Sequence, residues 1–227
     1  MEQEIQYSAS VMHANLACLE KDFRELEAVG CDELHFDVMD GLFVPDFTLG
    51  CDFIKAARSC CGLPCSAHLM ISRPEKYIER FVEAGCSSVT VHVETCVHAH
   101  RVLNQIRDAG ASPGVAINPA TSLTKLDYLL DLVDRVLVMT VDPGYADESI
   151  IKGAFERVRI ISENIRYRKL KARVEVDGNI TVHDAALLVN AGASILDCGT
   201  SSIFDGRNPG EALVDFREKV EMARKVV

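Results

Sequence analysis

Four segments of the chain share one pattern, in which a helical stretch ends at a glycine and an apolar strand follows within a few residues. The glycines are Gly30, Gly85, Gly110 and Gly192. Glycine readily ends a helix in the left-handed conformation, and short apolar runs bounded by turn residues are typical of buried strands. A chain that repeats this unit is expected to alternate helices with parallel strands.

Apolar periodicity extends this pattern along the chain. It predicts strands at residues 7–12, 33–37, 64–70, 88–92, 113–117, 135–140, 172–177 and 194–198. It predicts helices at residues 19–29, 52–59, 75–84, 98–109, 123–130, 153–167, 182–190 and 210–226. Eight such units in 227 residues indicate an α/β fold, a (β/α)₈ TIM barrel that forms a single domain over residues 1–227. A doubly wound open sheet is the alternative, but it usually has a glycine-rich turn after its first strand, where this chain has none.

Composition excludes several kinds of partner. The net charge of −10 argues against binding to nucleic acid or to an anionic membrane surface. No apolar run approaches the ~20 residues of a membrane span, and the acidic N-terminus does not resemble a signal peptide. The nine cysteines include no matched CxxC pairs, so most are expected to be reduced core residues. We expect a cytoplasmic homo-oligomer.

Polar residues concentrate at the C-terminal ends of the predicted strands, where a parallel barrel places its active site. Strand periodicity puts His35 and Asp37 on one face of their strand, and His68 and Asp177 end two other strands. Two imidazoles and two carboxylates at one barrel mouth form a plausible site for one divalent cation such as Zn²⁺, Fe²⁺, Mn²⁺ or Co²⁺. His92 and Glu94 lie at another strand end, and we interpret them as supporting residues.

The strand ends also argue against some reaction types. No lysine lies at any predicted strand end, which disfavours a Schiff-base aldolase. Barrels commonly bind phosphate in the loops after strands 7 and 8. Here those loops contain Gly178 and the run Gly199, Thr200 and Ser201, and the loop with Gly144 could close over them. The sequence therefore predicts an anion site built from backbone amides and hydroxyls.

Across nearly the whole chain, the sequence resembles the ribulose-phosphate 3-epimerase family, which includes allulose-6-phosphate 3-epimerases. The matching motifs are Ser8 to Val11, His35 to Gly41, Phe43 to Pro45, His68 to Met70, Thr90 to His92, Asn118 to Pro119, Val138 to Gly144, Glu175 to Gly178 and Gly199 to Ser201.

The resemblance implies an isomerase of the pentose phosphate pathway that converts D-ribulose 5-phosphate to D-xylulose 5-phosphate. It implies that His35, Asp37, His68 and Asp177 hold the metal. Asp37 and Asp177 would also be the two bases that exchange the C3 proton through an enediolate. Ser10 and His68 would contact the substrate, and Met39, Met70 and Met139 would form an apolar wall around the reacting carbon.

Two departures from the family pattern concern the substrate. Residues 145–148 include Asp147 and Glu148, which would repel a phosphate unless they faced solvent, and Asn179 stands where many members have glycine. A D-allulose 6-phosphate 3-epimerase or related ketose epimerase is therefore the first alternative. A metal-dependent aldolase or lyase and a non-catalytic sugar-phosphate binder are alternatives of other classes.

Overall fold

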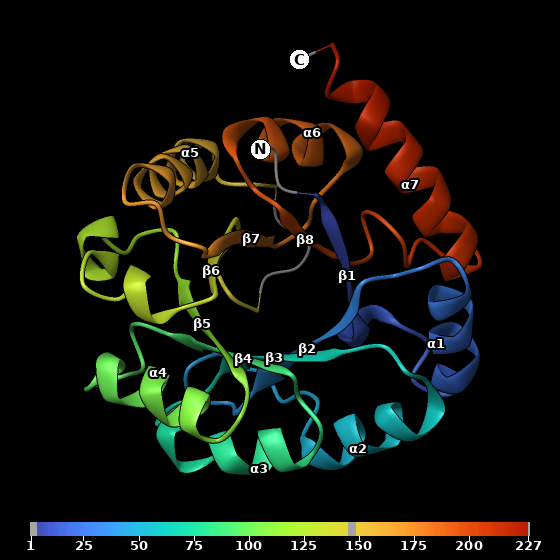
Figure 1. Ribbon diagram of the computed structural model, residues 1–227. Helices are drawn as coiled ribbons and strands as arrows, with labels where there is room; N and C mark the ends of the chain where they lie inside the picture. Colours follow the sequence, from blue (N-terminus) through green and yellow to red (C-terminus); the bar gives the residue numbers. More distant parts are fainter. Residues whose placement is uncertain (1–3, 145–148, 227) are drawn as a thin grey trace.

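Eight parallel strands close into a barrel in chain order, with β8 pairing back onto β1. The structure is a computed structural model that describes residues 4–144 and 149–226. Its strands are β1 (Gln6–Ser10), β2 (Glu33–Met39), β3 (Cys65–Met70), β4 (Ser88–His92), β5 (Ser112–Ile117), β6 (Arg135–Met139), β7 (Arg173–Asp177) and β8 (Ile195–Cys198). Figure 1 shows them at the centre of a ring of helices. The predicted (β/α)₈ barrel is confirmed.

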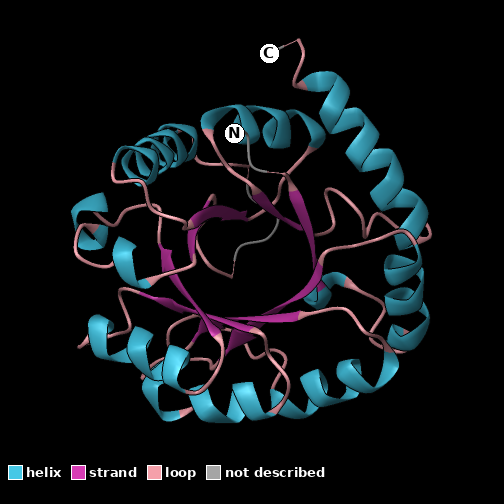
Figure 2. Cartoon of the chain, viewed as in Figure 1, coloured by secondary structure: helices cyan, strands magenta, loops and turns pink. Residues whose placement is uncertain are grey.

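Seven α-helices cover the outside of the barrel in the described part of the chain (Figure 2). They are α1 (Leu19–Ala28), α2 (Cys51–Cys60), α3 (Ile78–Glu83), α4 (Ala99–Asp108), α5 (Gly153–Tyr167), α6 (Val182–Ala191) and α7 (Pro209–Ala223). Short 3₁₀ turns occur at Val11–His13, Pro74–Lys76, Leu123–Leu126 and Leu130–Leu132. Within residues 4–144 and 149–226, no helix combines the length and apolar character needed to cross a bilayer.

The prediction of a helix over residues 123–130 is wrong. The chain between β5 and β6 instead makes two 3₁₀ turns. Leu123, Leu126, Leu129 and Leu132 recur at every third residue, which matches the three residues per turn of a 3₁₀-helix better than an α-helical period. Leu126 and Leu129 are buried, so the short turns still cover this side of the barrel.

The glycines that were expected to end helices adopt left-handed conformations. Their φ angles are 72° at Gly30, 109° at Gly85, 98° at Gly110 and 115° at Gly192. A residue with a Cβ atom is strained in this region, so glycine allows each helix to turn sharply into the next strand.

Each strand separates two environments. On β2, Leu34, Phe36 and Val38 belong to the large apolar core of buried side chains that strands and helices share. The alternate residues His35 and Asp37 lie inside the barrel and are also buried. The apolar core therefore lies between barrel and helices, and polar side chains are left to the interior.

Candidate active site

A pocket opens at the C-terminal ends of the strands, where the active site was predicted. Its lining includes the predicted residues Ser10, Asp37, Met39, Met70, Met139, Gly144, Asp177, Gly178, Gly199 and Thr200. His35 and His68 lie deeper and are almost completely buried. His68 and Ser201, which were predicted to contact substrate, are not among the residues that line this pocket.

The four predicted metal ligands lie together. One nitrogen or oxygen atom from each residue lies within 4.8 Å of the other three. Oδ1 of Asp37 is 3.2 Å from Nε2 of His35 and 3.0 Å from Nδ1 of His68. Nδ1 of His68 is in turn 3.5 Å from Oδ2 of Asp177. Two imidazole nitrogens and two carboxylate oxygens at these separations fit a single divalent cation.

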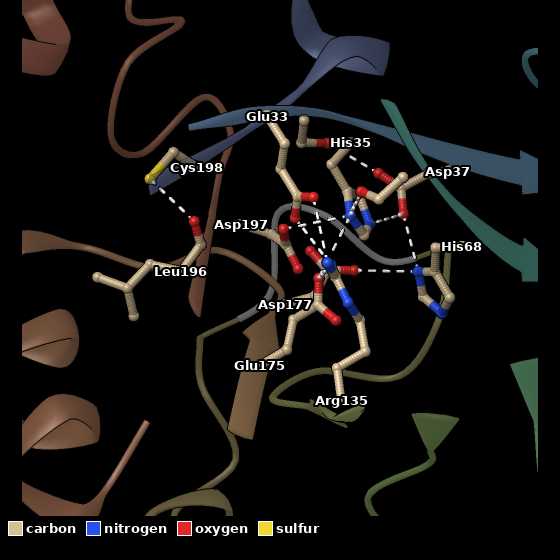
Figure 3. Close-up of polar contacts among 12 residues, drawn as sticks. Glu33, His35, Asp37, His68, Arg135, Glu175, Asp177, Leu196, Asp197 and Cys198 are labelled. Atoms are coloured by element: carbon tan, nitrogen blue, oxygen red, sulfur yellow. Dashed lines mark hydrogen bonds and ion pairs between the residues drawn. The ribbon is translucent and has the colours of Figure 1, made fainter. Parts of the chain in front are cut away.

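Strand register explains why these side chains meet. Asp37 on β2 pairs in register with His68 on β3, and His35 pairs with Ser10 on β1. Asp177 is the last residue of β7 and reaches the cluster from across the barrel, as Figure 3 shows. Oγ of Ser10 donates a 2.8 Å hydrogen bond to Oδ2 of Asp37. This bond leaves Oδ1 of Asp37 facing the two imidazoles.

The electrostatics of the cluster favour ion pairs. Burial alone would raise the pKa of Asp37, but contact with His35 and His68 holds that pKa well below its usual value. Burial alone would lower the pKa of His35, but Asp197 and Asp37 bring it well above its usual value. Protons on the imidazoles therefore offset the carboxylate charges, and a cation that binds here must displace them.

A third histidine, His92, extends the site outward from the cluster. Nε2 of His68 is 2.8 Å from Nε2 of His92, and Nδ1 of His92 is 3.3 Å from Oε2 of Glu94. Burial lowers the pKa of His92 to about 4, which keeps this imidazole neutral at neutral pH. Nε2 of a neutral His92 can accept a hydrogen bond from Nε2–H of His68, while its Nδ1–H donates a hydrogen bond to Glu94. This chain of hydrogen bonds leaves Nδ1 of His68 free to bind a cation.

The three predicted methionines lie on two sides of the pocket. Met39 and Met70 pack with Val44 in one small apolar cluster. Met139 packs with Ala116 and Leu137 in another cluster inside the barrel. All three line the pocket, so apolar surface faces its polar floor from two directions.

The loops predicted to bind an anion form one side of the pocket. Gly144 and Gly178 have φ angles of 86° and 120°, which residues with a Cβ atom rarely adopt. A Cβ atom on Gly199 would lie 2.9 Å from Cδ2 of His13, so glycine lets this imidazole approach the loop. Ser201 donates a hydrogen bond to Oδ1 of Asn179, which ties the loops after β7 and β8 together.

Sequence reasoning missed several lining residues. They are Met12, His13, Asp46, Val141 and Asp197, whereas Asn179, noted above as a departure from the family pattern, also lines the pocket. His13 could have been suspected because it lies in the turn that directly follows the first strand. Asp197 had a clearer signal, since it is an acid in the short, otherwise apolar strand Ile195–Cys198. The departure noted at residues 145–148 lies outside the described residues.

Solved structures of other proteins share the fold of this chain. A structure of KGPDC from Streptococcus mutans has a TM-score of 0.74 at 15% identity, covering 96% of this chain and 98% of that one. A mutant tryptophan synthase alpha-subunit from Pyrococcus furiosus has a TM-score of 0.66 at 15% identity, covering 98% of this chain and 99% of that one. At such low identity these similarities concern the barrel alone.

Comparisons of sequence are more specific. The Ribulose-phosphate 3 epimerase family matches residues 6–204. A ribulose-phosphate 3-epimerase from Aquifex aeolicus is 39% identical over 88% of this chain and 89% of its own length. One from Escherichia coli is 34% identical over 93% of this chain and 94% of its own. The chloroplastic ribulose-5-phosphate-3-epimerase of Arabidopsis thaliana is 38% identical over 92% of this chain and 75% of its own. The chain therefore belongs to the ribulose-phosphate 3-epimerase family.

Proposed function

We propose that this chain inverts C3 of a ketose phosphate, interconverting D-ribulose 5-phosphate and D-xylulose 5-phosphate with the help of one divalent cation. Its family consists of carbohydrate epimerases, which are isomerases. The observation that carries the proposal is the meeting of Asp37 and Asp177, from β2 and β7, beside two imidazoles at one pocket.

Two carboxylates suit the chemistry of inversion. The C3 hydrogen of a 2-ketose is acidic because the neighbouring carbonyl can take up the charge left when the proton departs. In the proposed mechanism, Asp37 or Asp177 removes the proton and leaves a planar enediolate. The other residue, protonated, returns a proton to the opposite face. The low pKa of Asp37 keeps its carboxylate ionised at neutral pH.

His35, Asp37, His68 and Asp177 would hold the cation, which when bound supplies Lewis-acid stabilisation to the charge developing on the substrate oxygens. The protein's own groups maintain the geometry. Ser10 holds the carboxylate of Asp37 in one orientation and lies within reach of the substrate. Around the reacting carbon, Met39, Met70 and Met139 would exclude water without offering a competing proton.

The phosphate would bind on the side of the pocket formed by the loops after β6, β7 and β8. Gly144, Gly178 and Gly199 allow close approach to the backbone, and Thr200 adds a hydroxyl to the lining. Ser201 would act through its hydrogen bond to Asn179. His13 is the only histidine, lysine or arginine among the residues that the structure places in this lining.

We further propose a cytoplasmic homo-oligomer. All nine cysteines are free, which suits a reducing compartment. Leu42 and Phe47, in the loop after β2, are each 79% exposed, and a second copy of the chain could cover them. Light scattering on the purified protein tests the assembly, because a monomer would have a mass of 25.0 kDa.

An assay over a small panel of ketoses tests the function. Ribulose 5-phosphate should turn over fastest, chelation should abolish turnover, and added divalent cations should restore it. Faster turnover of allulose 6-phosphate or of an unphosphorylated ketose would show that this sugar, and not ribulose 5-phosphate, is the preferred substrate. Release of a smaller carbonyl fragment would indicate an aldolase, and binding without exchange of the C3 hydrogen would indicate a sugar-phosphate binder.

A further inference from the structure

A layer of buried charged side chains lies inside the barrel, one inward-facing position closer to the N-terminal ends of the strands than the proposed metal ligands. Arg135, at the start of β6, donates to Oε1 of Glu33 at 2.7 Å and to Oε1 of Glu175 at 3.1 Å. A third acid, Asp197 on β8, completes the layer, and Figure 3 shows these side chains gathered beside His35. The layer thus contains three acids and one guanidinium group.

Asp197 is the acid of this layer to which Arg135 donates no hydrogen bond. Its side chain is buried, and neither carboxylate oxygen has a hydrogen bond of good geometry within the described residues. Burying a carboxylate without such partners strongly disfavours folding. A group that is kept despite this penalty needs an explanation beyond packing.

The nearest basic atom to Asp197 belongs to a proposed metal ligand. Nδ1 of His35 lies 3.2 Å from Oδ1 of Asp197, and Nε2 of the same ring faces Asp37 in the cation site. Oε1 of Glu175 is farther from Nδ1, at 3.7 Å. His35 therefore has the cation site on one side and the buried carboxylate of Asp197 on the other.

We propose that Asp197 is a positioning residue that orients the His35 imidazole and strengthens its hold on the divalent cation. The inference rests on the proposed metal site and adds a residue to it. A histidine that binds a cation through Nε2 carries its hydrogen on Nδ1, and a carboxylate behind Nδ1 fixes that tautomer and makes Nε2 a better donor. The negative charge of the layer also favours a cation directly above it.

A hydroxyl competes for the same role. Oγ of Ser66 is also 3.2 Å from Nδ1 of His35, with hydrogen-bond geometry. A hydroxyl could fix the tautomer, but it carries no charge and would add little to the attraction for a dication. The two residues can be separated by changing each alone.

The test measures metal affinity directly. Purified Asp197→Asn and wild-type proteins, stripped of metal, are titrated with Zn²⁺ in competition with a chromophoric chelator. Loss of a group that orients a metal-binding histidine typically weakens metal binding roughly 10- to 100-fold, so the dissociation constant of Asp197→Asn should rise at least about tenfold. Absorption spectra of the Co²⁺-loaded proteins give another readout, and the ligand-field bands should shift in the variant.

Two serine variants serve as matched controls. Ser66→Ala should weaken Zn²⁺ binding less than Asp197→Asn does. Ser88 is the register partner of Ser66 on β4, and its buried hydroxyl lacks a hydrogen-bond partner within the described residues. Ser88→Ala should bind Zn²⁺ as the wild type does. If Ser66→Ala weakens binding as much as Asp197→Asn, the hydroxyl positions His35 and the proposal fails.

Stability without metal separates a positioning role from a structural one. Asp197→Asn removes a buried carboxylate that accepts no hydrogen bond from the described residues, but it also removes the ion pair with His35, so metal-free Asp197→Asn should unfold at a urea concentration close to that of wild type. An Asp197→Asn protein that binds Zn²⁺ within twofold of wild type would overturn the inference while leaving the metal site intact. If the wild type itself binds no divalent cation, the proposed metal site fails instead.

Discussion

The outer and inner faces of the same strands have opposite characters. On β2, Phe36 and its outward neighbours are apolar and pack under the helices, whereas His35 and Asp37 point inward among other charged groups. Both faces are buried, so exposure to solvent does not distinguish them. Burial of apolar area on the outer face stabilises the fold, and burial of polar groups on the inner face offsets part of that stabilisation.

This contrast suggests a division of roles within each strand. Changes on the outer face should reduce stability and leave the chemistry of folded molecules intact. Changes on the inner face should reduce chemistry or metal binding and change stability at neutral pH much less.

The largest effect should come from the proposed acid/base pair. Asp177→Asn keeps the shape of the side chain but removes its basicity, so epimerisation should fall on the order of 10³-fold or more. The metal-free free energy of unfolding should change by no more than about 1.5 kcal/mol, because the substitution loses one long contact with His68. Steady-state assays and urea denaturation measure the two quantities. Asp52→Asn is the matched control, because Asp52 is fully exposed on α2. If Asp177→Asn turned over substrate at the wild-type rate, Asp177 would have no role in the mechanism.

The outer face should show the opposite result. Phe36 is completely buried in the apolar core, so Phe36→Ala should lower the free energy of unfolding by about 3–5 kcal/mol. The fraction that remains folded should bind Zn²⁺ with wild-type affinity. Tyr167→Ala removes an 88% exposed ring and should change stability by less than about 0.5 kcal/mol. A Phe36→Ala protein of normal stability but weak metal binding would contradict the proposed division of roles between the outer and inner faces.

The inner face should also make the fold sensitive to acid. Burial lowers the pKa of His92 to about 4, so below pH ~6.5 the unfolded chain gains a proton here that the folded chain does not. The contribution of His92 to the free energy of unfolding should therefore fall as the pH drops from about 6.5 to 4. His92→Gln should remove up to about 3 kcal/mol of that fall. Urea denaturation at a series of pH values, with a chelator present, measures the free energy of unfolding. If it depends on pH in His92→Gln as it does in wild type, the prediction is contradicted. His183→Gln, at an exposed histidine, is the control.

The smallest effect concerns substrate phosphate. His13 lies against Gly199, on the side of the pocket where phosphate is proposed to bind. His13→Gln should raise KM for a ketose phosphate several-fold, equivalent to about 0.5–1.5 kcal/mol, with little change in kcat. KM for the unphosphorylated ketose should not change. An equal rise in KM for both sugars would mean that His13 does not contact the phosphate.

Much of the fold follows from local sequence. The alternation of helices and strands, the glycines that end helices and the inward position of Asp37 depend on neighbours a few residues apart. The region around Leu126 was predicted wrongly because apolar spacing of three and of 3.6 residues is hard to distinguish over eight residues. The roles assigned to the site residues stay predictions.

The missed parts of the site depend on packing between strands. Alternation indicates that Asp197 points into the barrel, but it does not place Asp197 beside His35 rather than another inward residue. That pairing depends on the stagger with which eight strands close. The contact between His68 and His92 likewise depends on side-chain direction across β3 and β4, which no local pattern encodes.

The central claim is that two carboxylates exchange the C3 proton from opposite faces of the substrate. The most direct measurement converts ribulose 5-phosphate in D₂O and follows the C3 hydrogen by NMR. The account predicts that the xylulose 5-phosphate formed carries deuterium at C3, and that Asp37→Asn and Asp177→Asn both suppress its formation. Product that retains the original C3 hydrogen, with either variant as fast as wild type, would contradict the account.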